Sequence, residues 1–157
     1  MKHRLLFVCT GNICRSPLAH RVFEHIAKEH KAEEHFSVAS AGTHSWHQGE
    51  EADPRMRKTS TDHGIPFSHL SRALKESDFD FYSYLFAMDH GHLAIMKSLN
   101  KERAQVYLFR NFDPEGNGNV PDPYYGGAEG FEEVYDIVYR TCKNIFDTFE
   151  KNNFEFL

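Results

Sequence analysis

The fold of this chain is built around one stretch near its start, Arg4-Leu5-Leu6-Phe7-Val8-Cys9-Thr10-Gly11-Asn12-Ile13-Cys14-Arg15-Ser16-Pro17. Its apolar part, residues 4–9, is typical of a buried parallel strand. Ser16 and Pro17 indicate the N-cap and the first position of a helix, because proline there loses a donor that has no partner anyway. Gly11 and Asn12 tolerate a positive φ. The stretch therefore predicts a strand, a tight loop and a helix in direct succession.

The predicted loop has the features of an oxyanion site. A helix N-terminus presents unpaired N–H groups and the positive end of its dipole, and a loop that wraps backward aims further N–H groups at the same point. The Arg15 guanidinium matches two oxygens of a phosphate. These positive surroundings favour the nucleophilic thiolate of Cys9, to which Ser16 can donate its hydroxyl. The other interpretation, a structural cysteine beside an unrelated arginine, does not account for the combined pattern.

Length and composition indicate one globular domain. The chain has 157 residues, enough for a single domain spanning 1–157, with 40% hydrophobic and 26% charged residues. Its net charge of −5 argues against nucleic acid and anionic membranes as partners. No stretch reaches the ~18 apolar residues of a membrane span, and the N-terminal apolar run is too short for a signal peptide. Three cysteines, two of them in one loop, do not form a disulfide framework, so we expect a cytoplasmic protein.

Strand and helix patterns alternate along the chain. Strands are predicted at residues 4–9, 36–41, 84–88 and 106–109. Helices are predicted at residues 17–30, 53–64, 89–98 and 130–150. The alternation predicts a three-layer α/β fold, an open parallel sheet of about four strands with helices on both faces and a phosphate-binding loop after the first strand. The last helix has an apolar face that includes Cys142, for which we expect a packing role.

A long loop without predicted secondary structure, residues 113–127, follows the last strand and leaves the sheet at the same edge as the Cys9 loop. Prolines stiffen the backbone on both sides of Asp122, and Tyr124 and Tyr125 add aromatic walls. A thiolate that attacks a phosphate ester needs an acid for the leaving oxygen and later a base for water, and one carboxyl group can serve as both. Asp122 is the candidate for this role, and an Asx-turn residue is the structural alternative.

No metal site is predicted. The residues from Asp113 mimic the start of a calcium loop, but the twelfth position, which should be glutamate, is Tyr124. The 11 histidines do not pair with cysteines at metal-ligand spacing, so we expect most of them on the surface. His63 and His69 lie in a helix-end and loop region from which they could line the pocket, but we expect them in solvent.

Two motifs stand in this order, Cys9-x5-Arg15-Ser16-Pro17 at the end of the first predicted strand and Asp122-Pro123-Tyr124-Tyr125 near the last predicted helix. With them the chain resembles the low-molecular-weight protein tyrosine phosphatases, from around Leu5 to around Phe149. Further landmarks of the resemblance are Ser40-Ala41-Gly42, Asp53-Pro54-Arg55, His63-Gly64-Ile65, Arg72 and Met88-Asp89.

The resemblance implies an enzyme that hydrolyses phosphotyrosine in proteins, and small aryl phosphates, through a phosphocysteine intermediate and without a cofactor or metal. Cys9 would be the nucleophile, Arg15 would clamp the phosphate and the transition state, and Ser16 would assist the thiolate. Asp122 would be the general acid and then the general base. The phosphate-binding residues would be Thr10, Gly11, Asn12, Ile13, Cys14 and Arg15.

The resemblance also implies supporting groups. Asn12, helped by Ser40, would hold the loop in its strained shape. Cys14 would trap oxidised Cys9 as a reversible disulfide, which the chemistry of a reactive thiol with a near neighbour also favours. The slot for the aromatic ring of the substrate would be formed by Ile13, Trp46 and Tyr124, with Tyr125 beside it.

Two sister activities share the fold that the resemblance implies. Thiol-dependent arsenate reductases need a further cysteine pair around the third strand, and residues 78–99 contain no cysteine. Arginine-phosphate phosphatases carry a threonine where Ile13 stands and lack the double tyrosine at Tyr124 and Tyr125. Both differences favour an aryl phosphate as the substrate.

Two other functions stay open at this point. A phosphotyrosine-binding module would capture ligands without turnover, but it needs neither the thiolate of Cys9 nor the acid Asp122. A redox sensor would use Cys9 and Cys14, with hydrolysis incidental. As partners we expect phosphotyrosine-containing proteins, no nucleic acid and no membrane span, and we expect a monomer that self-associates at most weakly.

Overall fold

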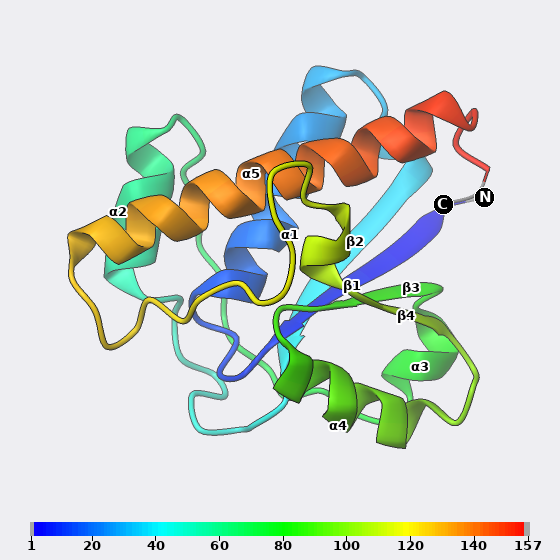
Figure 1. Cartoon of the computed structure of the whole chain (residues 1–157), viewed down its shortest axis with the longest axis horizontal. Coiled ribbons are helices and arrows are strands. Elements are labelled where there is room, and N and C mark those ends of the chain that lie inside the picture. The colour runs from blue at the N-terminus through cyan, green and yellow to red at the C-terminus, as the bar shows by residue number, and fades with distance from the viewer. Residues whose placement is uncertain (1, 156–157) are drawn as a thin grey trace.

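The computed structural model, which describes residues 2–155, contains a four-stranded sheet in which all strands are parallel. Its strands are β1 (His3–Cys9), β2 (Phe36–Gly42), β3 (Tyr84–Ala87) and β4 (Gln105–Leu108). Their order across the sheet is β2-β1-β3-β4, so β1 lies between two neighbours and ends with Cys9 at the carboxyl edge (Figure 1). The predicted open parallel sheet is confirmed.

Helices cover both faces of the sheet, as predicted. The helices of the described residues are α1 (Arg15–Glu29), α2 (Pro54–Asp62), α3 (Asp78–Phe81), α4 (His90–Asn100) and α5 (Ala128–Lys151), with 3₁₀ helices η1 (Glu33–His35) and η2 (Phe109–Phe112). α1 and α5 pack together on one face, with α2 beside them, and α3 and α4 lie on the other (Figure 1). The sequence patterns missed α3 and both 3₁₀ helices because segments of three or four residues are too short to show a periodicity.

Alternate residues of β1 serve two separate cores. Leu5 and Phe7 belong to the core under α1 and α5, whereas Leu6 and Val8 belong to the core on the side of α4. Successive side chains of a strand point to opposite faces, so a strand covered on both sides must be apolar throughout. The uninterrupted apolar run at the start of the sequence is explained by this position.

The apolar face predicted for the last helix packs into the larger core. Val138 and Phe149 of α5 are fully buried there. Cys142 lies on the same face, and its thiol donates a hydrogen bond to the Ala19 carbonyl oxygen at 3.5 Å. Burial raises the pKa of Cys142 well above its ordinary value, which keeps the group a neutral thiol. The predicted packing role of Cys142 is confirmed.

The start of α1 corrects a prediction. The helix begins at Arg15, and Cys14 occupies the N-cap position without a side-chain cap hydrogen bond. Ser16, which we predicted as the N-cap, lies in the first turn and uses its hydroxyl inside the preceding loop instead. Pro17 also lies in the first turn, where N–H groups have no partner within the helix. A hydroxyl near a helix start suits either role, so the sequence alone did not separate them.

The segment just past α5 packs back onto the sheet. Phe154, just past α5, stacks on the ring of His35 with 4.1 Å between the ring centroids, and its carbonyl oxygen is hydrogen-bonded to His3. The end of α5 is thereby tied to the start of β1. No helix within residues 2–155 has both the length and the apolar character required to cross a bilayer.

A buried carboxylate fastens the start of the long loop to α5. The side chain of Asp113 is fully buried, and it accepts hydrogen bonds from Arg140 Nε at 2.8 Å and Arg110 Nε at 2.9 Å. Burial alone would raise the pKa of Asp113, but the hydrogen bonds from Arg140, the Glu115 N–H and Arg110 outweigh it and lower the pKa. The segment that resembles a calcium loop is therefore an arginine-bound turn.

We predict that Asp113→Asn lowers the free energy of unfolding by about 2–4 kcal/mol at neutral pH, because two partly buried arginines lose their carboxylate. A lowered folded pKa means that this stabilisation is present above the ordinary aspartate pKa of about 4 and disappears as the pH falls through the folded value. Urea unfolding of both proteins should therefore show their stabilities converging in acid. Asp62→Asn, which removes an exposed partner of Lys58, is the control and should change stability by less than about 0.5 kcal/mol. A constant difference at all pH values would contradict the assignment.

Candidate active site

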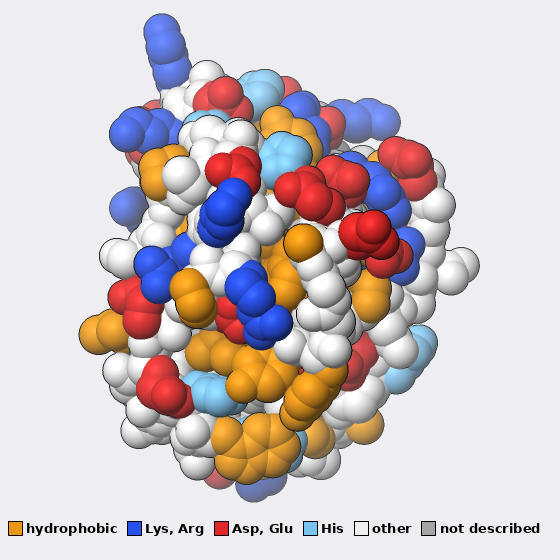
Figure 2. Space-filling view, turned by 90° about the vertical axis from the view of Figure 1, so that its left-hand side faces the viewer, with side chains coloured by type: hydrophobic (Ala, Val, Ile, Leu, Met, Phe, Trp, Pro, Cys, Tyr) orange, Lys and Arg blue, Asp and Glu red, His pale blue; other side chains and the backbone are white. Residues whose placement is uncertain are grey.

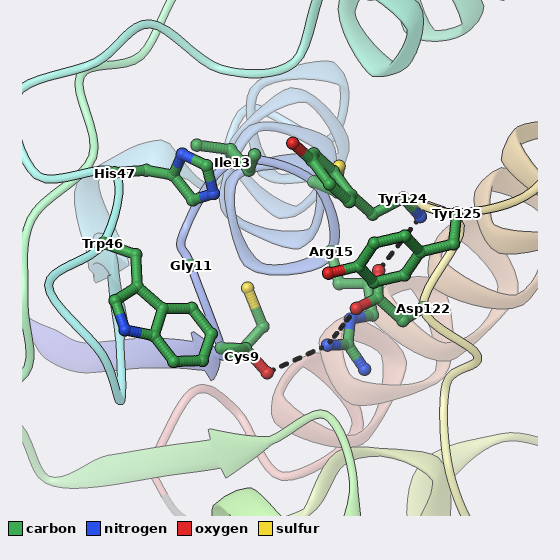
Figure 3. Close-up of a pocket in the computed structure, with 11 residues that line it drawn as sticks. Cys9, Gly11, Ile13, Arg15, Trp46, His47, Asp122, Tyr124 and Tyr125 are labelled. Atoms are coloured by element: carbon green, nitrogen blue, oxygen red, sulfur yellow. Dashed lines mark hydrogen bonds and ion pairs between the residues drawn. The ribbon is translucent and has the colours of Figure 1, made fainter.

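A pocket at the carboxyl edge of the sheet brings the two predicted motifs together. The loop after β1 forms its floor, the loop after β2 forms one wall, and the long loop before α5 forms the other (Figure 3). The sulfur of Cys9 points into the space between the walls (Figure 3). The lining residues are Cys9, Thr10, Gly11, Ile13, Cys14, Arg15, Trp46, His47, Asp122, Tyr124 and Tyr125.

Three carbonyl groups of the loop after β1 are held by N–H groups from outside the loop. The carbonyl oxygens of Cys9 and Thr10 accept hydrogen bonds from N–H groups of the chain just after β2, at 2.8 and 3.0 Å. That of Ile13 accepts from the N–H group of Asp53 at 2.9 Å. In a trans peptide unit the N–H group points opposite to the carbonyl group, so the N–H group that follows each of these carbonyls is turned to the pocket side. This arrangement suits an anion at the centre of the loop.

Asn12 holds the loop in a strained conformation. Its φ is 57°, in the left-handed region that few residues other than glycine adopt. Its side-chain oxygen accepts from His69 Nε2 at 2.8 Å and from the Arg72 N–H group at 3.0 Å. Its side-chain nitrogen donates to Ser16 Oγ at 2.8 Å. Three hydrogen bonds therefore fix a backbone conformation that is unfavourable by itself.

Two glycines lie at close contacts, Gly42 against backbone that cannot give way and Gly11 against a side chain. Gly11, for which the sequence allowed a positive φ, does not adopt one. A Cβ at Gly11 would lie 2.8 Å from Cδ2 of His47, which packs over the loop. A Cβ at Gly42, the last residue of β2, would lie 2.6 Å from the Thr10 carbonyl oxygen. The absence of side chains lets the β2 end and its following loop approach the floor of the pocket.

The hydroxyl of Ser16 is directed at the nucleophile candidate. The nitrogen of the Asn12 side chain can only donate, so Ser16 Oγ accepts from it and keeps its own hydrogen for another partner. Cys9 Sγ lies 3.0 Å from Ser16 Oγ, and the Ala41 carbonyl oxygen lies 3.4 Å away. The shorter contact places the Ser16 hydroxyl to donate to a Cys9 thiolate.

Arg15 is held from two sides at the pocket floor. Its side chain is 4% exposed; Nη1 donates to Asp89 Oδ2 at 3.2 Å and to the Val120 carbonyl oxygen at 3.1 Å. The other oxygen of Asp89 accepts from the His92 N–H group at 2.9 Å, so one carboxylate caps α4 and orients Arg15. Burial alone would raise the pKa of Asp89, but the hydrogen bond from the His92 N–H group and the charge of Arg15 lower it. The sequence marked Asp89 as the start of a helix and as a landmark of the resemblance, without a role in the pocket.

Asp122 reaches the same arginine from the long loop. Its Oδ1 accepts from the N–H group of Tyr124 at 3.0 Å, and its Oδ2 lies 3.5 Å from Arg15 Nη2. The turn that the sequence offered as an alternative role is therefore present, and it aims the carboxylate into the pocket (Figure 3). The backbone is anchored just before, where the Val120 N–H group donates to the Met88 carbonyl oxygen at 2.8 Å.

Aromatic rings form the outer walls. Trp46 is 70% exposed and stacks on His44, with 4.3 Å between the centroids. On the opposite wall, Tyr124 lies 6.0 Å from the His47 ring, and Tyr125, 90% exposed, packs edge-on against Tyr124. On this side of the molecule, hydrophobic side chains gather in the lower part of the face, bordered by charged side chains of both signs and by histidines (Figure 2). A flat apolar ligand would cover this exposed surface.

The expectation that His69 lies in solvent is wrong. His69 is partly buried, and besides its bond to Asn12 its Nε2 lies 3.4 Å from Ser40 Oγ. Ser40 Oγ is also 3.3 Å from His20 Nδ1, so Ser40 supports the loop through His69. Burial and then the positive charges of His20 and Arg21 lower the pKa of His69 to about 4, which leaves it neutral near pH 7. Its segment has no regular secondary structure, so no sequence pattern marked it.

Of the other histidines, only His20 and His92 are buried, so most keep some exposed surface as expected. Of the 11, only His30, His63 and His90 are exposed, and His63 is thus in solvent as expected. The remaining imidazoles are wholly or partly buried, and those of His35 and His44 stack on aromatic rings, which a count of polar residues does not anticipate. Within residues 2–155, no three His, Cys, Asp or Glu side chains are grouped to hold a metal ion.

Cys14 lines the pocket as a neutral thiol. It is buried, and burial followed by the negative charge of Asp53 raises its pKa far above the ordinary value. Cys9, Cys14 and Cys142 are all free cysteines that form no disulfide in the structure. The two cysteines of the loop therefore differ, since the Ser16 hydroxyl faces Cys9 and an acidic side chain lies near Cys14.

Comparisons with known proteins agree with this geometry. The family model of the low molecular weight phosphotyrosine protein phosphatases matches residues 4–154. A low molecular weight protein-tyrosine-phosphatase of Streptomyces coelicolor is 42% identical over 144 residues, which is 88% of either chain. A low molecular weight phosphotyrosine protein phosphatase of Schizosaccharomyces pombe is 41% identical over 136 residues, 84% of this chain and 87% of the relative. A crystal structure of a protein tyrosine phosphatase from Entamoeba histolytica superimposes with a TM-score of 0.92 at 37% identity, covering 97% of this chain and 99% of that one.

Proposed function

Because the chain belongs to the low molecular weight phosphotyrosine protein phosphatase family, we propose that Cys9, Arg15 and Asp122 are the groups with which it hydrolyses phosphotyrosine. The chain is a protein-tyrosine phosphatase, a hydrolase of phosphoric monoesters. One observation carries the assignment of the residues: a cysteine sulfur, a buried arginine and a carboxylate line one pocket below aromatic walls. Nucleophile, charge and proton donor are all supplied by side chains and backbone.

The loop binds the phosphoryl group. The N–H groups turned to the pocket side and the Arg15 guanidinium would hold the oxygens that carry the negative charge of the transition state. Because Asp89 and Val120 already orient Arg15, it needs little rearrangement when substrate arrives.

In the first step, the Cys9 thiolate attacks phosphorus in line with the ester oxygen. The sulfur–phosphorus bond forms as the phosphorus–oxygen bond breaks, and the protonated Asp122 carboxyl gives its proton to the departing phenolate oxygen. The products are tyrosine, which leaves, and a phosphocysteine on Cys9.

In the second step, water replaces the thiol. The Asp122 carboxylate takes a proton from a water molecule as its oxygen attacks phosphorus, and the sulfur–phosphorus bond breaks. The Cys9 thiolate leaves with the bonding electron pair, and the hydrogen bond from Ser16 stabilises the charge that collects on sulfur. Inorganic phosphate is released, and Asp122 is protonated for the next cycle.

The pocket walls support an aryl phosphate as the substrate. A phosphotyrosine ring entering above Cys9 would lie between Trp46 on one wall and Tyr124 and Tyr125 on the other, burying exposed aromatic surface. Ile13 offers an apolar side chain at the floor, on which an aromatic ring can pack. We therefore propose phosphotyrosine-containing proteins as substrates and a reducing, cytoplasmic setting that keeps Cys9 from being oxidised.

The decisive experiment is hydrolysis of para-nitrophenyl phosphate at mildly acidic pH in the presence of a chelator. We predict turnover in the natural protein, its loss in Cys9→Ser, and a fall in kcat by about 10²–10⁴ in Arg15→Ala, since a transition-state contact disappears. Mass spectrometry of acid-quenched protein should show a phosphoryl group on Cys9. A protein that binds phosphotyrosine but never turns it over would instead be a binding module. Equal turnover in Cys9→Ser would overturn the assignment of the nucleophile.

We predict that Asp122→Asn lowers kcat for phenyl phosphate by about 10²–10⁴. The fall in kcat for para-nitrophenyl phosphate should be smaller. The nitrophenolate leaves readily without a proton, whereas phenolate needs one. The measurement is kcat for both esters. Glu129→Gln, which changes an exposed acid at the start of α5, is the control and should leave both rates unchanged. Identical losses for the two esters would remove Asp122 from the acid role.

We also propose that Cys14 protects oxidised Cys9. Hydrogen peroxide would convert the Cys9 thiolate to a sulfenic acid with loss of hydroxide, and the Cys14 thiol would then attack the Cys9 sulfur, forming a disulfide and releasing water. We predict that peroxide-treated natural protein regains activity with dithiothreitol, whereas Cys14→Ser loses it permanently through further oxidation. Cys142→Ala, altered away from the pocket, should recover like the natural protein. Full recovery of Cys14→Ser would rule this protection out.

A further inference from the structure

His92, in the first turn of α4, is buried against the phosphate-binding loop although it belongs to neither sequence motif. Its Nε2 lies 2.7 Å from Thr10 Oγ1. Thr10 Oγ1 in turn accepts from Arg15 Nη2 at 3.3 Å. On the other side of the ring, His92 Nδ1 is 3.2 Å from Asp89 Oδ1, too poorly aligned for a hydrogen bond. Because Asp89 Oδ2 accepts from Arg15 Nη1, the four side chains form a closed ring.

The contacts fix the position of the protons in this ring. An unprotonated Nδ1 would hold its lone pair against the Asp89 carboxylate, so Nδ1 carries a hydrogen. A second hydrogen on Nε2 would make the imidazole a buried cation beside Arg15. The neutral ring with hydrogen on Nδ1 leaves Nε2 as an acceptor, and Thr10 then donates its hydroxyl hydrogen to His92 while its oxygen accepts from Arg15.

The charges around His92 agree with a neutral ring. Burial is the largest influence, and the nearby Arg15 and His44 disfavour a further positive charge, while Asp89 and Asp122 favour it. Together they lower the pKa of His92 to about 4. Near neutral pH the imidazole is therefore an acceptor at Nε2.

We propose that His92 is a positioning residue for catalysis: by accepting the Thr10 hydroxyl hydrogen it fixes Thr10 Oγ1 as the acceptor that aligns the Arg15 guanidinium with the phosphoryl group. The proposal rests on the proposed function, in which Arg15 binds the transition state. Asp89 and Val120 hold the Nη1 side of Arg15, and the Thr10–His92 pair holds the Nη2 side, which also faces Asp122. Both ends of the fork are then fixed before substrate binds.

A double-mutant cycle tests this chain of contacts. Thr10→Val keeps the shape of the side chain but removes the hydroxyl, and His92→Leu removes the acceptor. Each should lower kcat/KM for para-nitrophenyl phosphate by about tenfold or more, mainly through kcat. The double variant should be no worse than the poorer single variant, because both substitutions break the same hydrogen bond. Effects that multiply would overturn the proposal.

Two variants separate positioning from simple loss of stability. His92→Gln, which offers an uncharged acceptor near the position of Nε2, should keep kcat/KM within about threefold of the natural protein. His90→Leu makes the same replacement at the exposed start of the same helix and should leave kcat/KM unchanged. Tm is recorded for every variant. If His92→Leu does not fold, Thr10→Val together with His92→Gln still decides the question. A His92→Gln protein that folds but loses activity as Thr10→Val does would contradict the acceptor role.

Binding measurements make the test independent of turnover. Orthovanadate mimics the trigonal-bipyramidal transition state, whereas inorganic phosphate mimics a ground state. Calorimetric titration should show vanadate affinity falling about tenfold or more in Thr10→Val and His92→Leu and phosphate affinity falling less. Equal weakening of both ligands would overturn the proposal. These titrations remain informative if the natural protein shows no Cys9-dependent turnover, an outcome that would defeat the proposed function but not the positioning role.

The position of the hydrogen on the His92 ring can be measured directly. In nitrogen-15 NMR spectra near neutral pH, His92 should show a protonated Nδ1 and an unprotonated Nε2. A spectrum with the hydrogen on Nε2 would overturn the proposal, because Thr10 would then no longer be the donor.

Discussion

The outward orientation of the carbonyl groups between β1 and α1 is the constraint on which the rest of the site depends. A single reversed peptide unit would present an oxygen, instead of an N–H group, to the anion that the loop is built to hold. Hydrogen bonds from the segment after β2 and from Asp53 prevent this reversal, and the side chain of Asn12 holds the one residue with a positive φ in the loop. Gly42 allows the close approach that those bonds require. The site is thus rigid before any ligand binds.

Arg15 joins three parts of the fold in this arrangement. It begins α1, it bonds to Asp89 at the start of α4, and it bonds to the Val120 carbonyl oxygen in the long loop. The long loop is itself fastened at its beginning, where Asp113 is bound by arginines of η2 and α5. A buried cation with several fixed acceptors is costly to move, so Arg15 positions the loop that carries Asp122 relative to the floor of the pocket.

The structure also shows why polar residues dominate the supporting contacts of a site that lies next to two apolar cores. Ser16, Asn12, His69 and Ser40 are connected by hydrogen bonds that lead from the Cys9 sulfur toward α1 and β2. A buried polar group without a hydrogen-bond partner destabilises the fold. Each polar side chain that orients the loop therefore requires a further polar side chain as its partner. The low pKa of His69 follows from the same burial, because a neutral imidazole is the cheaper state there.

The sequence by itself determined the parallel sheet, the helices longer than eight residues and the contiguous loop from Cys9 to Arg15. These depend on short-range patterns, namely apolar runs, caps and spacing, that remain the same wherever the segment is placed. Asp122 could be found because prolines and tyrosines mark it locally. Only the tertiary structure placed His69, Asp89 and His92 in the site, since they contact loop residues that lie 57, 74 and 82 positions away in the sequence. It also decided that Ser16 donates to sulfur instead of capping the helix. A side-chain hydrogen bond between residues so far apart depends on how β2, α4 and the loops pack together at the sheet edge. Local periodicity in the sequence does not predict that packing.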